Sequence, residues 1–212
     1  MYVFFFLVEL CCLFGSSYFA IQVLYRIFFL ISKSTKASAY MLSFLFFPGS
    51  LVHELAHVFM AMILGVRIGK IDLFPKINGE EVRLGSVEVY KSDSFRRFFI
   101  GIAPLFVGML GIYGALEYVE NRYIIYYLLF IIANNMFSSK FDMEGVMPLL
   151  VTVIFFTLVV FGIGVQIPSE VWQKLNMMSE SGTRLLMVPL ALNLGVVVLG
   201  KVFTYRYQSR SS

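Results

Sequence analysis

The chain has 212 residues, of which 59% are hydrophobic, 17% aromatic and only 14% charged, and its mean hydropathy is +0.82. Soluble domains of this length are about 45–50% apolar and about 25% charged, so the composition argues against a cytosolic enzyme, a secreted disulfide scaffold and a disordered protein. The formal net charge of +4 is a mild basic excess of the kind found in the cytoplasmic loops of membrane proteins, and it does not indicate nucleic-acid binding. We therefore expect a single domain, residues 1–212, embedded in a lipid bilayer.

Hydropathy predicts about six membrane-spanning segments. A spanning helix needs about 20 mostly apolar residues, and the fourth segment is short enough to be only partly membranous. The first segment is either one tilted helix or, if Gly15, Ser16 and Ser17 break it, a hairpin. The predicted fold class is an all-α polytopic membrane protein. The segments are residues 2–31, 40–64, 95–119, 123–137, 145–165 and 185–203.

A stretch of different character lies between the second and third segments. Apolar and polar residues alternate there on both sides of Asn78-Gly79, which predicts a short β hairpin within residues 66–90. We expect its strands within residues 66–74 and 82–90. An exposed edge of such a hairpin is suited to hold an extended peptide by strand addition, although a small cap at the membrane surface is an equally good interpretation.

The same connection predicts the orientation in the membrane, because it is the most basic in the chain. The positive-inside rule places it in the cytoplasm, and with six spans both termini of this multi-pass protein of the cell membrane are also cytoplasmic. Lys33 and Lys36, which follow the first segment, oppose this orientation. The basic residues of the connection are Arg67, Lys70, Lys76, Arg83, Lys91, Arg96 and Arg97.

The second segment contains the motif His53-Glu54-Leu55-Ala56-His57, which uses both histidines of the chain. Residues four apart share one face of an α-helix, so the two imidazoles can reach a single metal ion. Glu54 follows the first of them and is close enough to hold the attacking water, as in zinc peptidases. Ionisable residues in a hydrocarbon environment are functional by default, so a zinc site is favoured over a polar cluster satisfied by neighbouring helices.

A catalytic zinc site typically has three protein ligands and an open position for water. The third ligand must be a carboxylate that returns to membrane depth, because the chain has no further histidine. Asp142 stands between two apolar runs and is the leading candidate, while Glu144 is its rival because spacing alone does not separate the two. An ordinary helix N-cap is the alternative role for Asp142.

These residues resemble the site-2 protease family of intramembrane zinc metalloproteases. The resemblance lies in the histidine motif of the second segment and in a distant aspartate-containing segment. Gly101-Ile102-Ala103-Pro104 is similar to the Gly-Pro element of that family, and Asn134 stands eight residues before Asp142, as the family's asparagine does. The family's prolines between these two residues are absent here, and no stretch is long enough for a PDZ domain. The resemblance covers roughly residues 40–150 and looks like a divergent branch.

The resemblance implies that His53, His57 and Asp142 bind zinc and that Glu54 is the catalytic base. The expected activity is hydrolysis of peptide bonds in membrane-spanning or membrane-proximal protein substrates. Asn134 is expected to add a side-chain hydrogen bond to an extended substrate segment. Separately, the candidates to line a water path are Ser50, Asn134, Asn135, Ser138 and Ser139, although for the serines a hydroxyl bonded to the backbone of its own helix is the favoured interpretation. No nucleic-acid partner is expected, and the oligomeric state is left open.

Two other functions compete with this hypothesis. The altered aspartate segment is also compatible with a non-catalytic membrane protein that binds transmembrane partners and uses zinc as a structural element. A metal transporter is disfavoured because that class needs charged residues along a path across the bilayer, whereas here they cluster at one depth. If the wild-type protein and a Glu54→Gln variant are equally active in cells, the function does not need the catalytic base, and the non-catalytic alternative is favoured.

Overall fold

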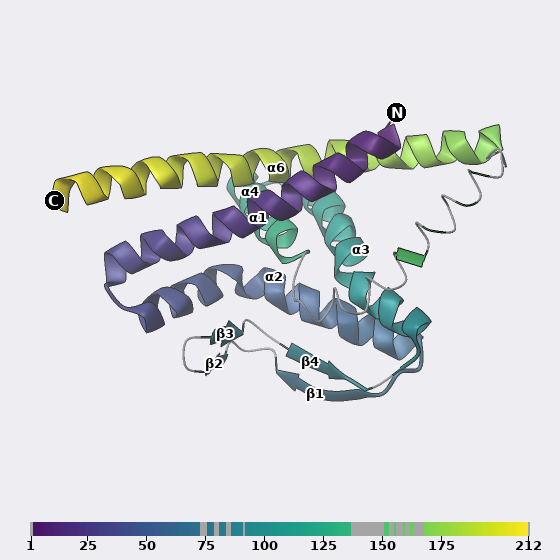
Figure 1. Ribbon diagram of the computed structural model, residues 1–212, viewed down its shortest axis with the longest axis horizontal. Coiled ribbons are helices and arrows are strands. Elements are labelled where there is room, and N and C mark those ends of the chain that lie inside the picture. The colour runs from purple at the N-terminus through teal and green to yellow at the C-terminus, as the bar shows by residue number, and fades with distance from the viewer. Residues whose placement is uncertain are drawn as a thin grey trace.

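The computed structural model describes residues 2–72, 76–78, 81–83, 86–90, 92–136, 151–152, 155, 159, 162 and 168–211. The helices are α1 (Tyr2–Ser32), α2 (Thr35–Ile63), α3 (Ser94–Tyr118), α4 (Arg122–Asn135) and α6 (Ser169–Ser211) (Figure 1). The strands are β1 (Ile68–Asp72), β2 (Lys76–Asn78), β3 (Glu81–Arg83) and β4 (Ser86–Val89). The mostly helical architecture with a small β element between the second and third helices agrees with the prediction.

Among the described residues, four helices are long and apolar enough to cross a membrane: α1, α2, α3 and α6. Helix α4 has 14 residues, fewer than the about 20 that a spanning helix needs, and most of the predicted segment 145–165 lies outside the described residues. The prediction of six spans is therefore not confirmed. The first segment is one continuous helix with Gly15 inside it, so its hairpin alternative is wrong.

The outward surfaces of the long helices are rich in large apolar side chains. Phe44 of α2 is 84% exposed, and Leu199 of α6 is 72% exposed. Exposed apolar surface on this scale is unfavourable in water. It is compatible with a membrane protein whose helices are surrounded by lipid.

Helices α1 and α6 pack along their lengths and run in the same direction (Figure 1). Close contacts pair residues of increasing number in both helices. Phe6 lies against Gly182, Ser17 accepts a hydrogen bond from Asn193, and Val23 lies against Gly200. Six alternating spans would make the first and last helices antiparallel, so this parallel packing differs from the predicted arrangement.

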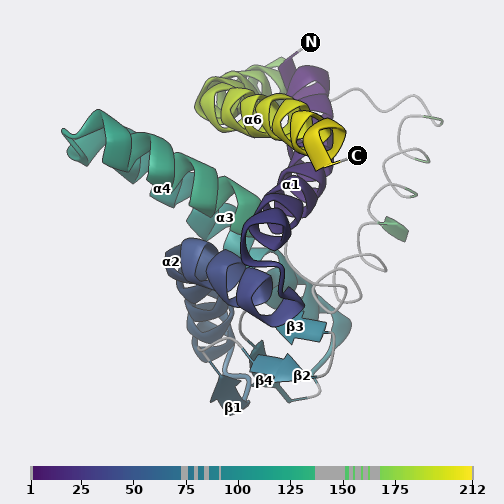
Figure 2. The same cartoon turned by 90° about the vertical axis from the view of Figure 1, so that its left-hand side faces the viewer.

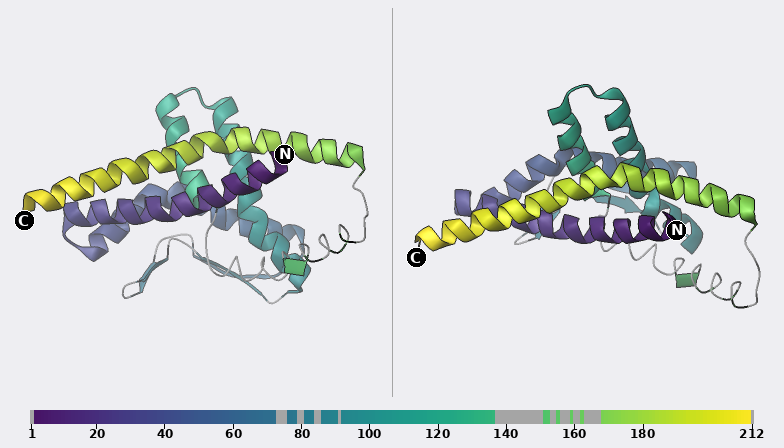
Figure 3. Two further views of the ribbon diagram at one scale, coloured as in Figure 1. Left: turned by 45° about the horizontal axis from the view of Figure 1, so that its top comes forward. Right: turned by 90° about the horizontal axis from the view of Figure 1, so that it is seen from above.

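The α3–α4 hairpin lies across the other helices rather than alongside them (Figures 2 and 3). Its inner face meets α1 and α6 in an apolar core. The buried members of this core are Leu13, Ile112, Ala115, Leu129, Ala133, Met136 and Leu186. The crossing brings the end of α4 and the first half of α3 against α2, whose contacts with both helices are extensive.

The strands form two antiparallel pairs, β1 with β4 and β2 with β3. The predicted hairpin therefore consists of two separate strand pairs. In the pair β2–β3, Asn78 lies opposite Glu81. Gly65 ends α2 and turns the chain toward β1. Its φ of +64° is strained for residues other than glycine. In this conformation the Val66 amide donates a hydrogen bond to the Ala61 carbonyl, as at many helix C-termini. The first strand pair consequently packs against the end of α2 through Val66, Ile68 and Val89.

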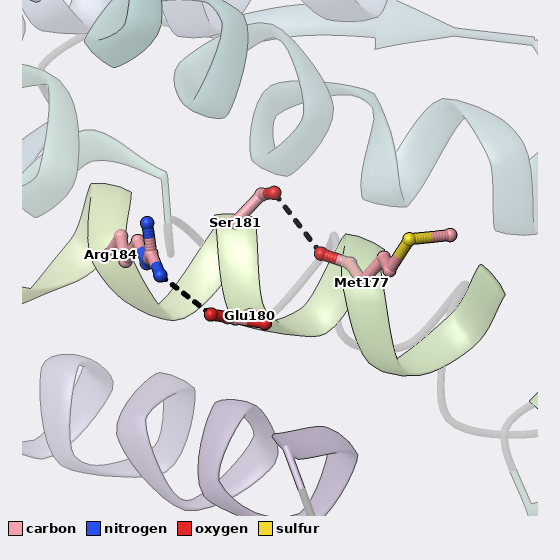
Figure 4. A network of polar contacts seen from close by, with 4 residues as sticks. All are labelled: Met177, Glu180, Ser181 and Arg184. Carbon is pink, nitrogen blue, oxygen red and sulfur yellow. Dashed lines mark hydrogen bonds and ion pairs between the residues drawn. The ribbon is translucent and has the colours of Figure 1, made fainter. Parts of the chain in front are cut away.

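Helix α6 is much longer than its apolar part. Its 43 residues span about 64 Å at 1.5 Å per residue, roughly twice the hydrocarbon thickness of about 30 Å. The N-terminal portion carries polar contacts typical of a water-exposed helix (Figure 4): Arg184 donates to Glu180 at 2.6 Å, and the Ser181 hydroxyl donates to the Met177 carbonyl at 3.1 Å. The helix therefore extends beyond both ends of the predicted segment 185–203.

Candidate metal centre

The buried face of α2 carries the histidine motif. His53 and His57 are each 5% exposed, and Glu54 is 8% exposed. Ser50 and Ala61 are buried on the same face, as the helical spacing of three and four residues requires. The sequence therefore directs the three motif side chains into the protein and away from the surrounding lipid.

His53 is oriented by the end of α4. Its Nδ1 atom lies 2.7 Å from the carbonyl oxygen of Asn135, the last residue of that helix. The last carbonyls of an α-helix have no partner within the helix, so this oxygen is able to accept a hydrogen bond from another helix. The C-terminus of α4 at this position therefore supplies the acceptor that fixes the His53 ring.

His57 is oriented by α3. Its Nδ1 atom lies 2.8 Å from the carbonyl oxygen of Ile100. Four residues later in the same helix stands Pro104, which has no N–H group to bond that carbonyl. The Gly-Ile-Ala-Pro element noted in the sequence thus frees an acceptor for the second histidine.

These two hydrogen bonds place the other ring nitrogens toward each other. The Nε2 atoms of His53 and His57 lie 3.1 Å apart. Carbonyl oxygens only accept, so Nδ1 is the donor in both rings, and a neutral ring then has an acceptor at Nε2. A proton shared by the two Nε2 atoms would make their contact an N–H···N hydrogen bond in the metal-free protein. Two nitrogens at 2.0–2.1 Å from a tetrahedral zinc ion are roughly 3.3 Å apart, so the pair fits the spacing and the tautomers that two zinc ligands need.

The approach of α4 to α2 depends on Gly49. A Cβ atom at this position would collide with the side-chain amide of Asn135 and would lie 2.7 Å from the Ile131 carbonyl oxygen. Glycine is therefore required one turn before His53, because a larger residue would push away the helix end that orients the ring.

Asn134 is buried beside this helix end, with 3% of its surface exposed. Its Nδ2 atom donates to the Phe130 carbonyl and to Oδ1 of Asn193 on α6, both at 2.7 Å. Within the part of the chain that the structure describes, its own Oδ1 is buried and has no hydrogen-bond partner. Most buried polar atoms in proteins have a hydrogen-bond partner, so this unpaired oxygen is unusual.

Asn193, which is fully buried, is absent from the residues predicted for the site. The available signal was an asparagine in the middle of the mostly apolar segment 185–203, because a polar group at membrane depth needs a partner. Its Nδ2 atom donates to Ser17 at 3.1 Å and Ser16 at 3.4 Å on α1. The Gly15-Ser16-Ser17 stretch, considered as a helix break, instead accepts hydrogen bonds from α6.

The predicted third ligand is not tested by this geometry, because Asp142 and its rival Glu144 lie outside the described residues, as do Ser138 and Ser139. Among the residues described, no group of three or more histidine, cysteine, aspartate and glutamate side chains is placed to hold a metal ion. The structure thus brings together His53 and His57 with Glu54 beside them, and the third ligand remains a prediction.

Comparisons of this chain with models of protein families, with curated proteins and with solved structures found no match.

Proposed function

We propose that the protein is an intramembrane zinc metalloprotease that hydrolyses peptide bonds of membrane-spanning or membrane-proximal proteins. The observation that carries this proposal is the paired orientation of His53 and His57. Each ring donates from Nδ1 to a backbone carbonyl of another helix, and the two Nε2 atoms meet at 3.1 Å. Backbone carbonyls are common partners of histidines that bind metals.

The proposed ligands are His53, His57 and Asp142. A zinc ion bound there would polarise the substrate carbonyl and make water nucleophilic near neutral pH. The buried position of the histidines supports this chemistry, because a low-dielectric site strengthens charge stabilisation. Burial also limits the access of water, so hydrolysis needs a polar route to the site, for which Ser50 is a candidate.

Glu54 would serve as the general base and then as the general acid. Its carboxylate accepts a proton from the attacking water, whose oxygen bonds to the substrate carbonyl carbon. The same proton passes to the amide nitrogen as the C–N bond breaks, which leaves a free carboxyl and a free amine. The buried Oδ1 of Asn134 would accept a hydrogen bond from the substrate backbone and hold the extended segment.

For the membrane arrangement, we propose that α1 and α6 both cross the bilayer. Their parallel packing then carries the N-terminus and the C-terminus to opposite faces. The basic β connection remains assigned to the cytoplasmic face, together with the N-terminus. The earlier opposition of Lys33 and Lys36 does not decide the matter, because both faces carry basic residues.

The test of the activity is a Glu54→Gln variant with Glu117→Gln as the control, since Glu117 is exposed at the end of α3. Membranes containing each form are mapped for new protein N-termini. We expect Glu54→Gln to keep its zinc and to abolish the new termini that wild type and Glu117→Gln produce. Equal cleavage by Glu54→Gln would overturn the proposed activity, and absence of cleavage by wild type with zinc bound would favour a non-catalytic, zinc-containing membrane protein.

A further inference from the structure

Asn193 connects three helices next to the end of α4 that orients His53. It is fully buried in α6, accepts a hydrogen bond from Asn134 of α4 at 2.7 Å, and donates to Ser17 of α1 at 3.1 Å. All its amide hydrogen-bonding groups are directed at protein side chains rather than at lipid. Such a fully paired amide fixes helices in one relative position, because any shift leaves a polar group unsatisfied.

The position fixed by Asn193 matters because Asn134 directly precedes Asn135. The Asn135 carbonyl oxygen is the acceptor for Nδ1 of His53. A displacement of the α4 end would lengthen this hydrogen bond while leaving that of His57 to α3 intact. The two histidines therefore depend on different helices, and only one of those helices is held by Asn193.

We propose that Asn193 is a positioning residue for His53. Its side-chain oxygen holds Asn134, and through it the end of α4, so that the Asn135 carbonyl keeps the His53 ring in the orientation that directs Nε2 toward His57. The proposal rests on the proposed function in so far as His53 is a zinc ligand. The orientation of the ring is a property of the metal-free protein and is tested separately.

The first experiment uses nitrogen-15 NMR of the histidine side chains in the full-length, metal-free protein. The chain has only two histidines, so a His57→Ala variant assigns both sets of signals. In wild type we expect both Nδ1 atoms to carry a slowly exchanging proton. In Asn193→Leu the His53 Nδ1 proton should exchange faster, while the His57 proton serves as the internal reference and remains unchanged. Unaltered exchange at His53, or an equal change at both histidines, would overturn the proposal.

The second experiment measures zinc affinity by competition with a chelator. Asn193→Leu should bind zinc roughly 10-fold or more weakly, the usual effect of losing a group that orients a ligand. Asn193→Asp keeps the oxygen that accepts from Asn134 and should restore most of the affinity. Ser17→Ala, which removes one of the two hydrogen bonds from Asn193 to α1 and leaves the one with Asn134, should leave zinc affinity within about twofold of wild type even if its thermal midpoint falls. Equal loss of affinity in Ser17→Ala and Asn193→Leu would indicate a general packing effect and would contradict the positioning role.

Two outcomes separate this proposal from the proposed function. If wild type binds no zinc but Asn193→Leu still releases the His53 proton, the positioning role stands and the protease proposal fails. If Asn193→Leu does not fold, Asn193→Ser replaces it, since its shorter side chain is polar but lacks the amide oxygen that accepts from Asn134. The same loss of the His53 proton is expected, and its retention would overturn the proposal.

Discussion

The Nε2 atoms of His53 and His57 lie 3.1 Å apart, and each ring is held from behind by a carbonyl of a different helix. Both carbonyls are ones that their own helices leave without a main-chain partner: Ile100 because of Pro104, and Asn135 because α4 ends there. The two histidine rings are thus oriented by main-chain carbonyls that become available at helix irregularities.

Replacing Pro104 by alanine should weaken zinc binding. The new amide N–H can bond the Ile100 carbonyl and compete with the Nδ1 proton of His57. We expect a loss of up to roughly 10-fold in zinc affinity. Pro189→Ala is the matched control, because Pro189 is also a buried helix proline but the carbonyl that it frees belongs to Leu185. Chelator competition gives both values, and equal affinities in the two variants would refute the role of Pro104.

Replacing Gly49 by alanine should have a similar effect through His53. The added Cβ would collide with the Asn135 side chain and crowd the Ile131 carbonyl, so α4 must move away from α2. We expect roughly 10-fold or greater loss of zinc affinity. Gly114→Ala provides the comparison, since a Cβ at that helix position meets nothing within 4 Å. Zinc titration of the two purified variants tests this, and wild-type affinity in Gly49→Ala would contradict it.

Chelation should destabilise wild type but not a variant that lacks a histidine ligand. A ligand that binds only the folded state stabilises it by about 2.7 kcal/mol when present at 100 times its Kd. Removal of zinc should therefore lower the thermal midpoint of wild type, whereas His57→Ala should melt at the same temperature with and without the chelator. Scanning both proteins in one detergent provides the comparison. An equal shift in the two proteins would mean that the chelator acts elsewhere.

The termini should lie on opposite faces of the membrane. Parallel α1 and α6 that both cross the bilayer require this result, whereas six alternating spans require the termini on one face. Reporter fusions at each end, one active only in the cytoplasm and one only outside it, give a direct measurement. Activity of the same reporter at both ends would show that α1 and α6 do not both cross.

Much of this arrangement could be predicted from local patterns. Helices α1, α2, α3 and α6 follow from long apolar runs, and the β element follows from alternation around Asn78-Gly79. The histidine pair follows from helical spacing alone, since positions 53 and 57 share a face. These features depend on residues that are near in sequence, so one chain contains enough information to find them.

The remaining features depend on contacts between distant segments. The direction of α6 relative to α1 is set by pairs such as Ser17 with Asn193, which no periodicity reveals. The orienting carbonyls of Ile100 and Asn135 are main-chain groups, so their identity depends on helix packing. Asn193 carried a readable signal as a polar residue in a mostly apolar segment, but the sequence does not show which residues it pairs with.

The most direct test of the zinc site is the metal content of the purified protein and of single-residue variants. Wild type should contain about one zinc ion per chain, and His53→Ala, His57→Ala and Asp142→Ala should each lose most of it. Glu144→Ala should retain the wild-type content. Retention of zinc by Asp142→Ala together with its loss from Glu144→Ala would reassign the third ligand, and full zinc content in both histidine variants would contradict the metal centre itself.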